Sequence, residues 1–253
     1  MSQSVRTRVA LAVAFALLAA SARAQQAPAT PAIDPAAVKA LEGMAMYLRN
    51  LKSFSVESVT TTDEVLDDGQ LAQYGSKVIF LVQTPNKLTI DVTSDRADRI
   101  FLYDGKSFTL YARRLNYYAT IPAPPTLREL DDLLVDKYDI QIPLADLFRF
   151  GNERWKASDI KAAVDLGPAE AGGTTCQHYA FRQDDVDFQV WIQKGVHPLP
   201  RKLVITTTTD PSRPQFSATY TWNLAPSYND ESFVFVPPPD ANKIVLATVD
   251  GTK

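Results

Sequence analysis

Two residues, Cys176 and His178, have the side-chain types that nucleophilic or metal chemistry would need. They lie two positions apart in a segment that predicts a strand, so their side chains point to the same face. They could form a Cys-His nucleophile or half of a metal site. Zinc, however, normally takes three or four ligands at recognisable spacing, and the only other histidine, His197, lies in a Gly-Val-His-Pro loop. We therefore interpret Cys176 and His178 as half-buried strand residues and keep an enzyme that uses them as the weaker alternative.

Paired acidic residues are the other candidates for acid–base chemistry. Each pair falls in a turn, at a strand end or in the first turn of a predicted helix, where acids aid solubility or complement the helix dipole; the pairs are Asp63-Glu64, Asp67-Asp68, Asp131-Asp132 and Asp184-Asp185. The chain has no nucleophile elbow, phosphate loop, dinucleotide fingerprint or metalloprotease helix. We expect a non-catalytic protein without a cofactor or a metal.

The first 24 residues have the features of a signal peptide. Two arginines precede an apolar run over 9–20, which is too short to span a bilayer as a helix, and Ala22-Arg23-Ala24 matches a cleavage site. A buried N-terminal helix is the alternative. We expect a mature chain that starts at Gln25, continues as a flexible linker over 25–33, and is soluble in the periplasm.

The composition is that of a folded globular domain. The apolar fraction is 45% and the charged fraction 22%, both ordinary for such domains. The net charge of −3 argues against nucleic acid as the main partner, because a phosphate-binding surface needs a basic excess. A single cysteine excludes an intramolecular disulfide, so the fold must depend on its core.

Strands dominate the region from Gln73 to Ile121. Leu88–Thr93 alternates apolar and polar residues as a half-buried strand does. Asp104-Gly105 stands between two apolar runs, which is a strong hairpin signal, and Thr84–Lys87 has turn composition. These features predict a long antiparallel meander.

Two longer helices are expected, one on each side of this meander. Asp34 and Pro35 are an N-cap and a first helical residue, and apolar spacing predicts a helix over Pro35–Asn50. Thr126 and Glu129 form a capping box for a helix that continues to Tyr138. A further short helix is expected at Pro143–Phe148.

About eleven strands are expected in all. Those outside the meander are Phe54–Val65, Ile160–Leu166, Thr174–Arg182, Val186–Ile192, Leu203–Thr208, Phe216–Leu224 and Phe233–Phe235. A sheet of that size tends to curl. The fold class is therefore mainly β (α+β): a curled, incompletely closed antiparallel β-barrel with helices on its concave side. We expect one domain over 34–239, ended by Pro237–Pro239, and a C-terminal tail over 240–253.

An apolar ligand site is predicted on one face of the meander. Leu88, Ile90 and Val92 share one side of their strand, whereas Thr89, Asp91 and Thr93 take the other, which should be wet. The expected ligand-binding residues are Phe80, Leu88, Ile90, Val92, Phe101, Tyr103, Phe108, Leu110, Tyr118 and Arg99. Four arginines interrupt this stretch, and each is either a solvated rim residue or one that holds a lid carbonyl or an anionic head group: Arg96, Arg99, Arg113 and Arg114.

A family resemblance adds to this interpretation. Leu81–Leu88, Tyr103–Tyr111 and Asn116–Tyr118 resemble the LolA/LolB-like superfamily of periplasmic lipoprotein carriers. More closely, the chain resembles a bacterial family of secreted proteins classed as a domain of unknown function; this resemblance rests on Ile121–Thr126, Gln141–Leu147, Ala180–Gln183 and Pro198–Ile205.

The resemblance implies an unclosed barrel wrapped on a helical lid, with an apolar ligand space inside. The ligand it implies is a lipid or the acyl chain of a lipoprotein. Because related proteins act as sensors, the alternative is a sensor or scaffold that binds another envelope protein, either a periplasmic or a membrane-anchored one.

Overall fold

The computed structural model describes residues 32–142 and 157–249. The expected signal peptide over 1–24, the linker up to residue 31 and the short helix at Pro143–Phe148 lie outside the described residues. None of the described helices is long and apolar enough to cross a membrane.

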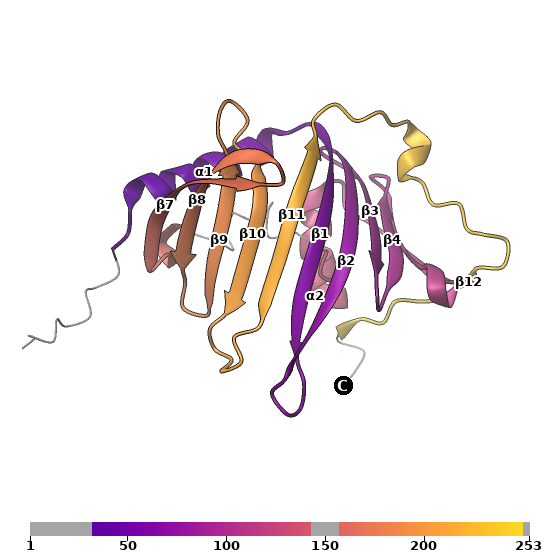
Figure 1. The fold of residues 1–253 in the computed structure, drawn as a ribbon. Coiled ribbons are helices and arrows are strands. Elements are labelled where there is room, and N and C mark those ends of the chain that lie inside the picture. Colours follow the sequence, from indigo (N-terminus) through magenta and orange to yellow (C-terminus); the bar gives the residue numbers. More distant parts are fainter. Residues whose placement is uncertain (1–31, 143–156, 250–253) are drawn as a thin grey trace, which may run out of the picture. The chain divides into compact units, whose positions relative to one another are not determined.

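Twelve strands form one sheet (Figure 1). In sheet order they are β12 (Asn242–Lys243), β6 (Tyr117–Pro122), β5 (Ser107–Ala112), β4 (Asp98–Tyr103), β3 (Lys87–Ser94), β2 (Leu71–Gln83), β1 (Ser53–Val65), β11 (Gln215–Asn223), β10 (Pro200–Thr207), β9 (Val186–Gln193), β8 (Thr174–Arg182) and β7 (Ala162–Ala171). All neighbours pair antiparallel except β12, which pairs parallel with β6. The sheet curls without closing, because β7 and β12 are separate edges, which confirms the predicted fold class.

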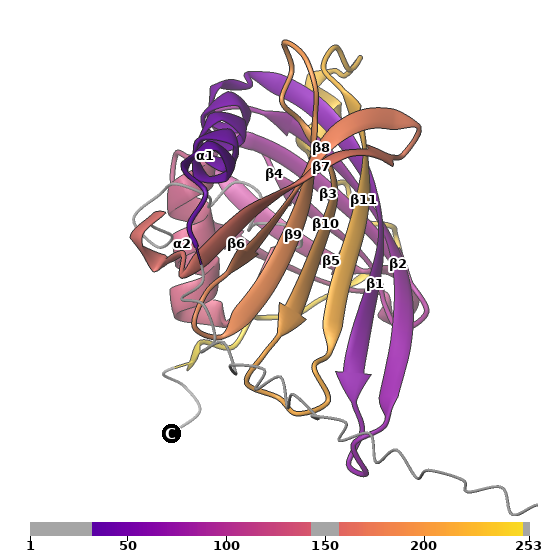
Figure 2. The ribbon, with the colours of Figure 1, turned by 60° about the vertical axis from the view of Figure 1, so that its left-hand side comes forward.

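Both predicted long helices form where their caps indicate. The Asp34 carboxylate accepts a hydrogen bond from Ala36 N at 2.8 Å at the start of α1 (Pro35–Asn50). Thr126 caps α2 (Leu127–Tyr138), and its hydroxyl donates to the Glu129 carboxylate at 2.7 Å. The two helices lie on the same side of the sheet (Figure 2). Their buried residues belong to the core that the sheet's inner face forms; they are Ala37, Leu41, Met44, Ala45, Leu48, Leu130 and Leu134.

The edge strand β7 is longer than predicted. The strand was expected to end at Leu166, but it continues through Gly167 and Pro168, and the chain turns at Gly172-Gly173. The register shifts between Asp165 and Gly167, where Gly167 has a φ of 93°. Bulges and prolines are tolerated at a sheet edge because the outer backbone groups need no partner.

The C-terminal part of the fold differs from the prediction. Phe233–Phe235 is not a strand; Phe233 is the last residue of a 3-10 helix over Asp230–Phe233, and it is buried. The ordered fold does not end at Pro237–Pro239 either, because β12 follows and pairs with β6. We call residues 224–249, yellow at the end of the chain in Figure 1, the C-terminal strap.

The C-terminal strap covers the outer face of the meander. Thr89 Oγ1 donates to the carbonyl of Ser232 at 2.6 Å, and Lys87 forms an ion pair with Asp230. The predicted wet side of β3 is therefore only partly wet: Thr89 and Asp91 are half-buried, and Thr93 alone is exposed.

Two further 3-10 helices complete the described elements. One spans Arg113–Leu115 between β5 and β6, and the other spans Ala157–Asp159 before β7.

Candidate functional site

The inner face of the meander gathers the predicted apolar residues. Residues directly opposite one another in an antiparallel pair lie on the same face. Two rows cross the sheet in this way, Leu88–Tyr103–Phe108 and Phe80–Ile90–Phe101–Leu110. Val92 belongs to the same side of β3. We call these eight residues the inner apolar surface; their shared face agrees with the sequence, and their role in ligand binding stays a prediction.

The inner apolar surface is covered. All of its residues are at most 8% exposed except Leu110, which is half-buried. Leu130 and Leu134 of α2 and the buried face of α1 belong to the same cluster. The helices thus form the second wall of this region, and the sheet forms the first.

The inner face also extends onto β1, beyond the predicted residues. Val56 lies opposite Phe80, and Ser58 lies opposite Val78. Val56 and Ser58 are both buried. The alternation of β1 was the signal that would have found them, because every second residue of a strand shares one face.

Tyr118 does not belong to the inner apolar surface, contrary to the prediction. It lies opposite Tyr111, which is opposite Ile100, so all three occupy the outer face. The ring of Phe235 in the C-terminal strap lies 5.1 Å from the Tyr118 ring and 5.3 Å from the Tyr111 ring. Tyr118 therefore packs the strap against the sheet.

Tyr103 connects the inner face to residues 123–126, the segment between β6 and α2. Its hydroxyl donates to the carbonyl of Pro124, and Leu127 N donates to Pro85 O at 2.8 Å. Burial, with smaller contributions from the carboxylates of Glu129 and Asp104, raises the pKa of Tyr103 to about 12. The hydroxyl therefore stays protonated and remains a donor at physiological pH.

Arg113 and Arg114 both hold other parts of the meander. Arg113 donates to Asp91 at 2.7 and 2.8 Å and to Asp98 at 2.7 Å. The hydrogen bond to Asp91 is the main cause that raises the pKa of Arg113. Arg114 donates to the carbonyls of Ser94 and Asp95 at 2.6 and 2.8 Å, so it is the arginine that holds backbone carbonyls.

The other two arginines differ from each other. Arg96 pairs with Glu64, and its guanidinium lies 3.7 Å from the centre of the Tyr74 ring. Arg99 is exposed and has no ion pair or side-chain hydrogen bond with the described residues. It lies opposite Val92, on the same face as the inner apolar surface. Arg99 is thus a cation at the rim of that surface.

Cys176 and His178 have separate partners. Cys176 is fully buried, its thiol donates to Thr174 O at 3.3 Å, and burial raises its pKa. His178 stacks on Trp191 with a ring separation of 3.8 Å and lies 3.0 Å from the Gln189 amide oxygen. Burial lowers the pKa of His178. Within the described ranges, no group of three or more His, Cys, Asp or Glu side chains could hold a metal ion.

The burial of Cys176 predicts a slow reaction with alkylating agents. Because only the thiolate reacts, a raised pKa and a closed environment both protect it. Iodoacetamide should modify the folded protein on the order of 100-fold more slowly than the protein in urea, since reaction requires local opening. Intact-mass measurement over time checks this, with Cys176→Ser as the unreactive control. Equal rates in the two states would contradict the buried position.

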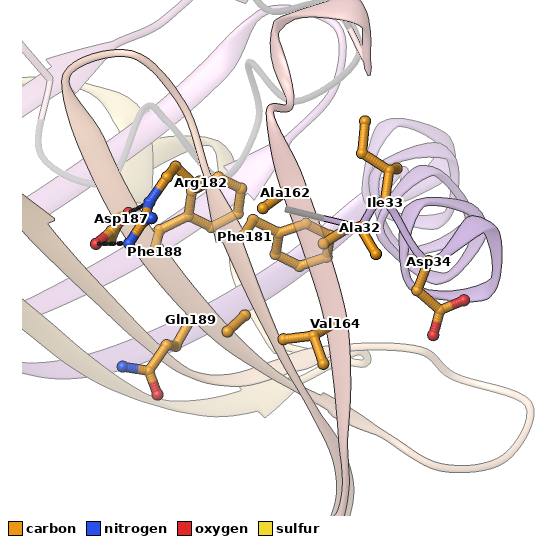
Figure 3. Close-up of a pocket in the computed structure, with 12 residues that line it drawn as sticks. Ala32, Ile33, Asp34, Ala162, Val164, Phe181, Arg182, Asp187, Phe188 and Gln189 are labelled. Atoms are coloured by element: carbon orange, nitrogen blue, oxygen red, sulfur yellow. Dashed lines mark hydrogen bonds and ion pairs between the residues drawn. The ribbon is translucent and has the colours of Figure 1, made fainter. Parts of the chain in front are cut away.

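A described pocket lies beside the edge strand β7 (Figure 3). Asp34 N donates to Ala163 O at 2.9 Å, which places residues 32–34 along β7. The pocket has a volume of about 590 Å³ and is lined by Ala32, Ile33, Asp34, Ala162, Ala163, Val164, Ala180, Phe181, Arg182, Asp187, Phe188 and Gln189. The sequence prediction did not include it, because residues from four separate segments form its walls.

The charged end of this pocket is neutralised. Arg182 donates to Asp187 at 2.7 and 3.0 Å, and Arg213 donates to the same carboxylate at 3.1 Å. These hydrogen bonds, chiefly the one from Arg182, lower the pKa of Asp187. The remaining lining is mostly apolar, so the pocket suits an apolar group better than acid–base chemistry.

Comparison with known proteins places this fold in a family. Residues 37–247 match the profile of the family described as "Predicted periplasmic protein (DUF2092)". This match confirms the resemblance to a secreted bacterial family of unknown function. No curated protein matches the chain.

Several solved structures are similar in fold at low sequence identity. An uncharacterized conserved protein from Thermus thermophilus is 9% identical, with a TM-score of 0.46 over 83% of this chain and 99% of that chain. LprF from Mycobacterium bovis is 12% identical, with a TM-score of 0.42 over 84% and 100% of the two chains. A LolA superfamily protein from Nitrosomonas europaea is 11% identical, with a TM-score of 0.36 over 79% and 97%.

Proposed function

Because this chain belongs to the DUF2092 family of predicted periplasmic proteins, we propose that it is a periplasmic carrier of acyl chains. The ligand is the hydrocarbon chain of a lipid or a lipoprotein, held between the inner apolar surface and the helices. The observation that carries the proposal is the unbroken apolar face, which crosses the sheet from Phe80 on β2 to Leu110 on β5. Apolar surface of this kind binds hydrocarbon by excluding water.

The attachment of the helices supports this proposal. Buried apolar side chains of both helices pack into the core that the sheet's inner face forms. The Tyr47 hydroxyl of α1 lies 2.6 Å from Nδ1 of His197, and the start of α2 is held through Leu127 N and Pro85 O. The strand ladder includes neither helix. The helices can therefore separate from the inner face without breaking the ladder, which is what entry of a chain would require.

Arg99 supplies the polar end of the proposed site. Its guanidinium stands at the rim of the inner apolar surface, and among the described residues no carboxylate neutralises it. A guanidinium binds phosphate or carboxylate through paired hydrogen bonds. We assign the head group of an anionic lipid to this position.

The test of the proposal is lipid binding by the exported protein. Native mass spectrometry of protein purified without detergent should detect a bound lipid, and a fluorescent fatty acid should bind to lipid-depleted protein. Arg99→Gln should weaken binding of an anionic lipid about threefold to tenfold, since one exposed charge-assisted contact is lost. The charge-matched control is Lys194→Gln, because Lys194 is exposed and lies in the turn after β9. A wild-type protein that binds no lipid at all would contradict the proposed carrier function.

A second candidate function is binding of another envelope protein beside β7. The observation that favours it is the pocket there, in whose wall Ile33 and Val164 are exposed. Exposed apolar side chains around a hollow are typical of protein-binding surfaces. A lipid-free protein that still binds an envelope partner would favour this function over the first.

A further inference from the structure

Ser58 is an unusual residue on the inner face of the sheet. Its side chain is 0% exposed, and its Oγ has no hydrogen-bond partner among the described residues. A buried hydroxyl without a partner is unfavourable, because it has given up its hydrogen bonds to water. An alanine would fill nearly the same space without that cost, so the hydroxyl calls for an explanation.

The position of Ser58 marks a change in the character of the inner face. On one side along β1 is Val56, whose row continues through Phe80 and Ile90 of the inner apolar surface. On the other side is Thr60, whose hydroxyl lies 2.9 Å from Ser76 Oγ. This neighbouring polar pair is satisfied internally, whereas Ser58 is not. Ser58 thus stands at the boundary between an apolar region and a polar one.

We propose that the Ser58 hydroxyl donates a hydrogen bond to the carbonyl oxygen of an ester-linked acyl chain bound on the inner apolar surface. This inference rests on the proposed carrier function and names the chemical class of its ligand. An acyl ester matches the boundary because its hydrocarbon chain lies along apolar residues and a single polar group ends the chain. The carbonyl oxygen of the ligand then accepts the hydrogen bond that no described protein group accepts from Ser58.

None of the described side chains around Ser58 accepts a hydrogen bond from its hydroxyl. The residues directly opposite it are Val78 on β2 and Tyr220 on β11. Val78 has no polar side-chain atom, and no hydrogen bond joins Ser58 Oγ to the Tyr220 hydroxyl. Along β1, Val56 is apolar, and the Thr60 hydroxyl is already bound to another side chain. A ligand atom is therefore the acceptor that the arrangement favours.

The experiment compares two probes that differ in one functional group. One is a lysophospholipid with an ester-linked palmitoyl chain, and the other is its analogue with an ether-linked hexadecyl chain, which lacks the carbonyl. Titration calorimetry of the wild-type protein should show about fivefold tighter binding of the ester, the amount that one hydrogen bond contributes. Ser58→Ala should abolish this preference and leave the affinity for the ether unchanged.

Two measurements keep the result interpretable. Ser217→Ala is the matched control, since Ser217 lies on the outer face of the neighbouring strand β11, opposite Thr61; it should retain the ester preference. The ligand-free Ser58→Ala protein should melt at the same or a higher temperature than the wild type. The proposal is overturned if wild type and Ser58→Ala show the same ester preference, or if the wild type binds both probes equally. Binding of neither probe by the wild type would instead overturn the carrier function itself.

Discussion

Replacing Ile90 by asparagine is expected to lower the free energy of unfolding by about 4 kcal/mol, the largest effect of any single change in the meander. Ile90 is fully buried between Phe80 and Phe101 in the middle of the inner apolar surface. The substitution loses buried methyl groups and places an amide where the strand neighbours offer no partner. Urea denaturation followed by tryptophan fluorescence measures the change.

Ile79→Asn is the matched control for this prediction. Ile79 lies on the neighbouring strand, points to the outer face opposite Asp91, and is 41% exposed. The same substitution should therefore cost less than about 1 kcal/mol there. Equal destabilisation by the two variants would contradict the assignment of inner and outer faces.

A substitution at Leu110 allows an effect on ligand binding to be measured without a large effect on stability. It continues the row of Ile90 and Phe101 but is only half-buried. Leu110→Asn should therefore leave the protein folded, because water can reach the new amide. If the inner apolar surface binds an acyl chain, this variant should still lose uptake of a fluorescent fatty acid.

Replacing Phe233 by alanine is expected to release the C-terminal strap and to lower the free energy of unfolding by about 3 kcal/mol. Phe233 is buried, its ring packs at 5.4 Å against Tyr228, and the Lys87 ammonium lies 5.6 Å from its centre. Loss of a buried aromatic ring leaves a cavity and removes these contacts. Urea denaturation reports the stability change.

Hydrogen exchange reports the release of the strap directly. Asn242 N donates to Asn116 O at 2.9 Å, and Ile244 N donates to Tyr118 O at 2.8 Å. Both amides should exchange faster in Phe233→Ala. Val236→Ala is the control, because Val236 is 80% exposed in the same strap and should change neither measurement. Unchanged protection of both amides in Phe233→Ala would show that the strap is held without this ring.

The sequence by itself determined the local structure of most elements. Asp34 and Thr126 predicted the starts of α1 and α2, because a side-chain oxygen at an N-cap satisfies a free backbone N–H. Asp104-Gly105 predicted the β4–β5 hairpin, because the turn requires a residue that tolerates positive φ, and Gly105 has a φ of 90°. Within a single strand, alternation also fixed which residues share a face, as for Leu88, Ile90 and Val92.

Only the tertiary structure determined which side chains of a neighbouring strand lie on the inner face of the sheet. A shift of one residue in register moves every side chain to the other face. The prediction was therefore right for the shared face of Phe101 and Phe108 but wrong for Tyr118, which the register with Tyr111 turns to the outer face.

Contacts between segments that are distant in the sequence could not be predicted from the sequence either. Phe233–Phe235 has the alternation of a strand, yet Phe233 is buried in a 3-10 helix because the outer face of the meander offers it a place to pack. The prolines at 237–239 indicated an end to the fold, but β12 beyond them pairs with β6. Only the folded structure shows that the Ser58 hydroxyl lacks a hydrogen-bond partner among the described residues. Its surroundings come from three strands and the core around them, which are far apart in the sequence.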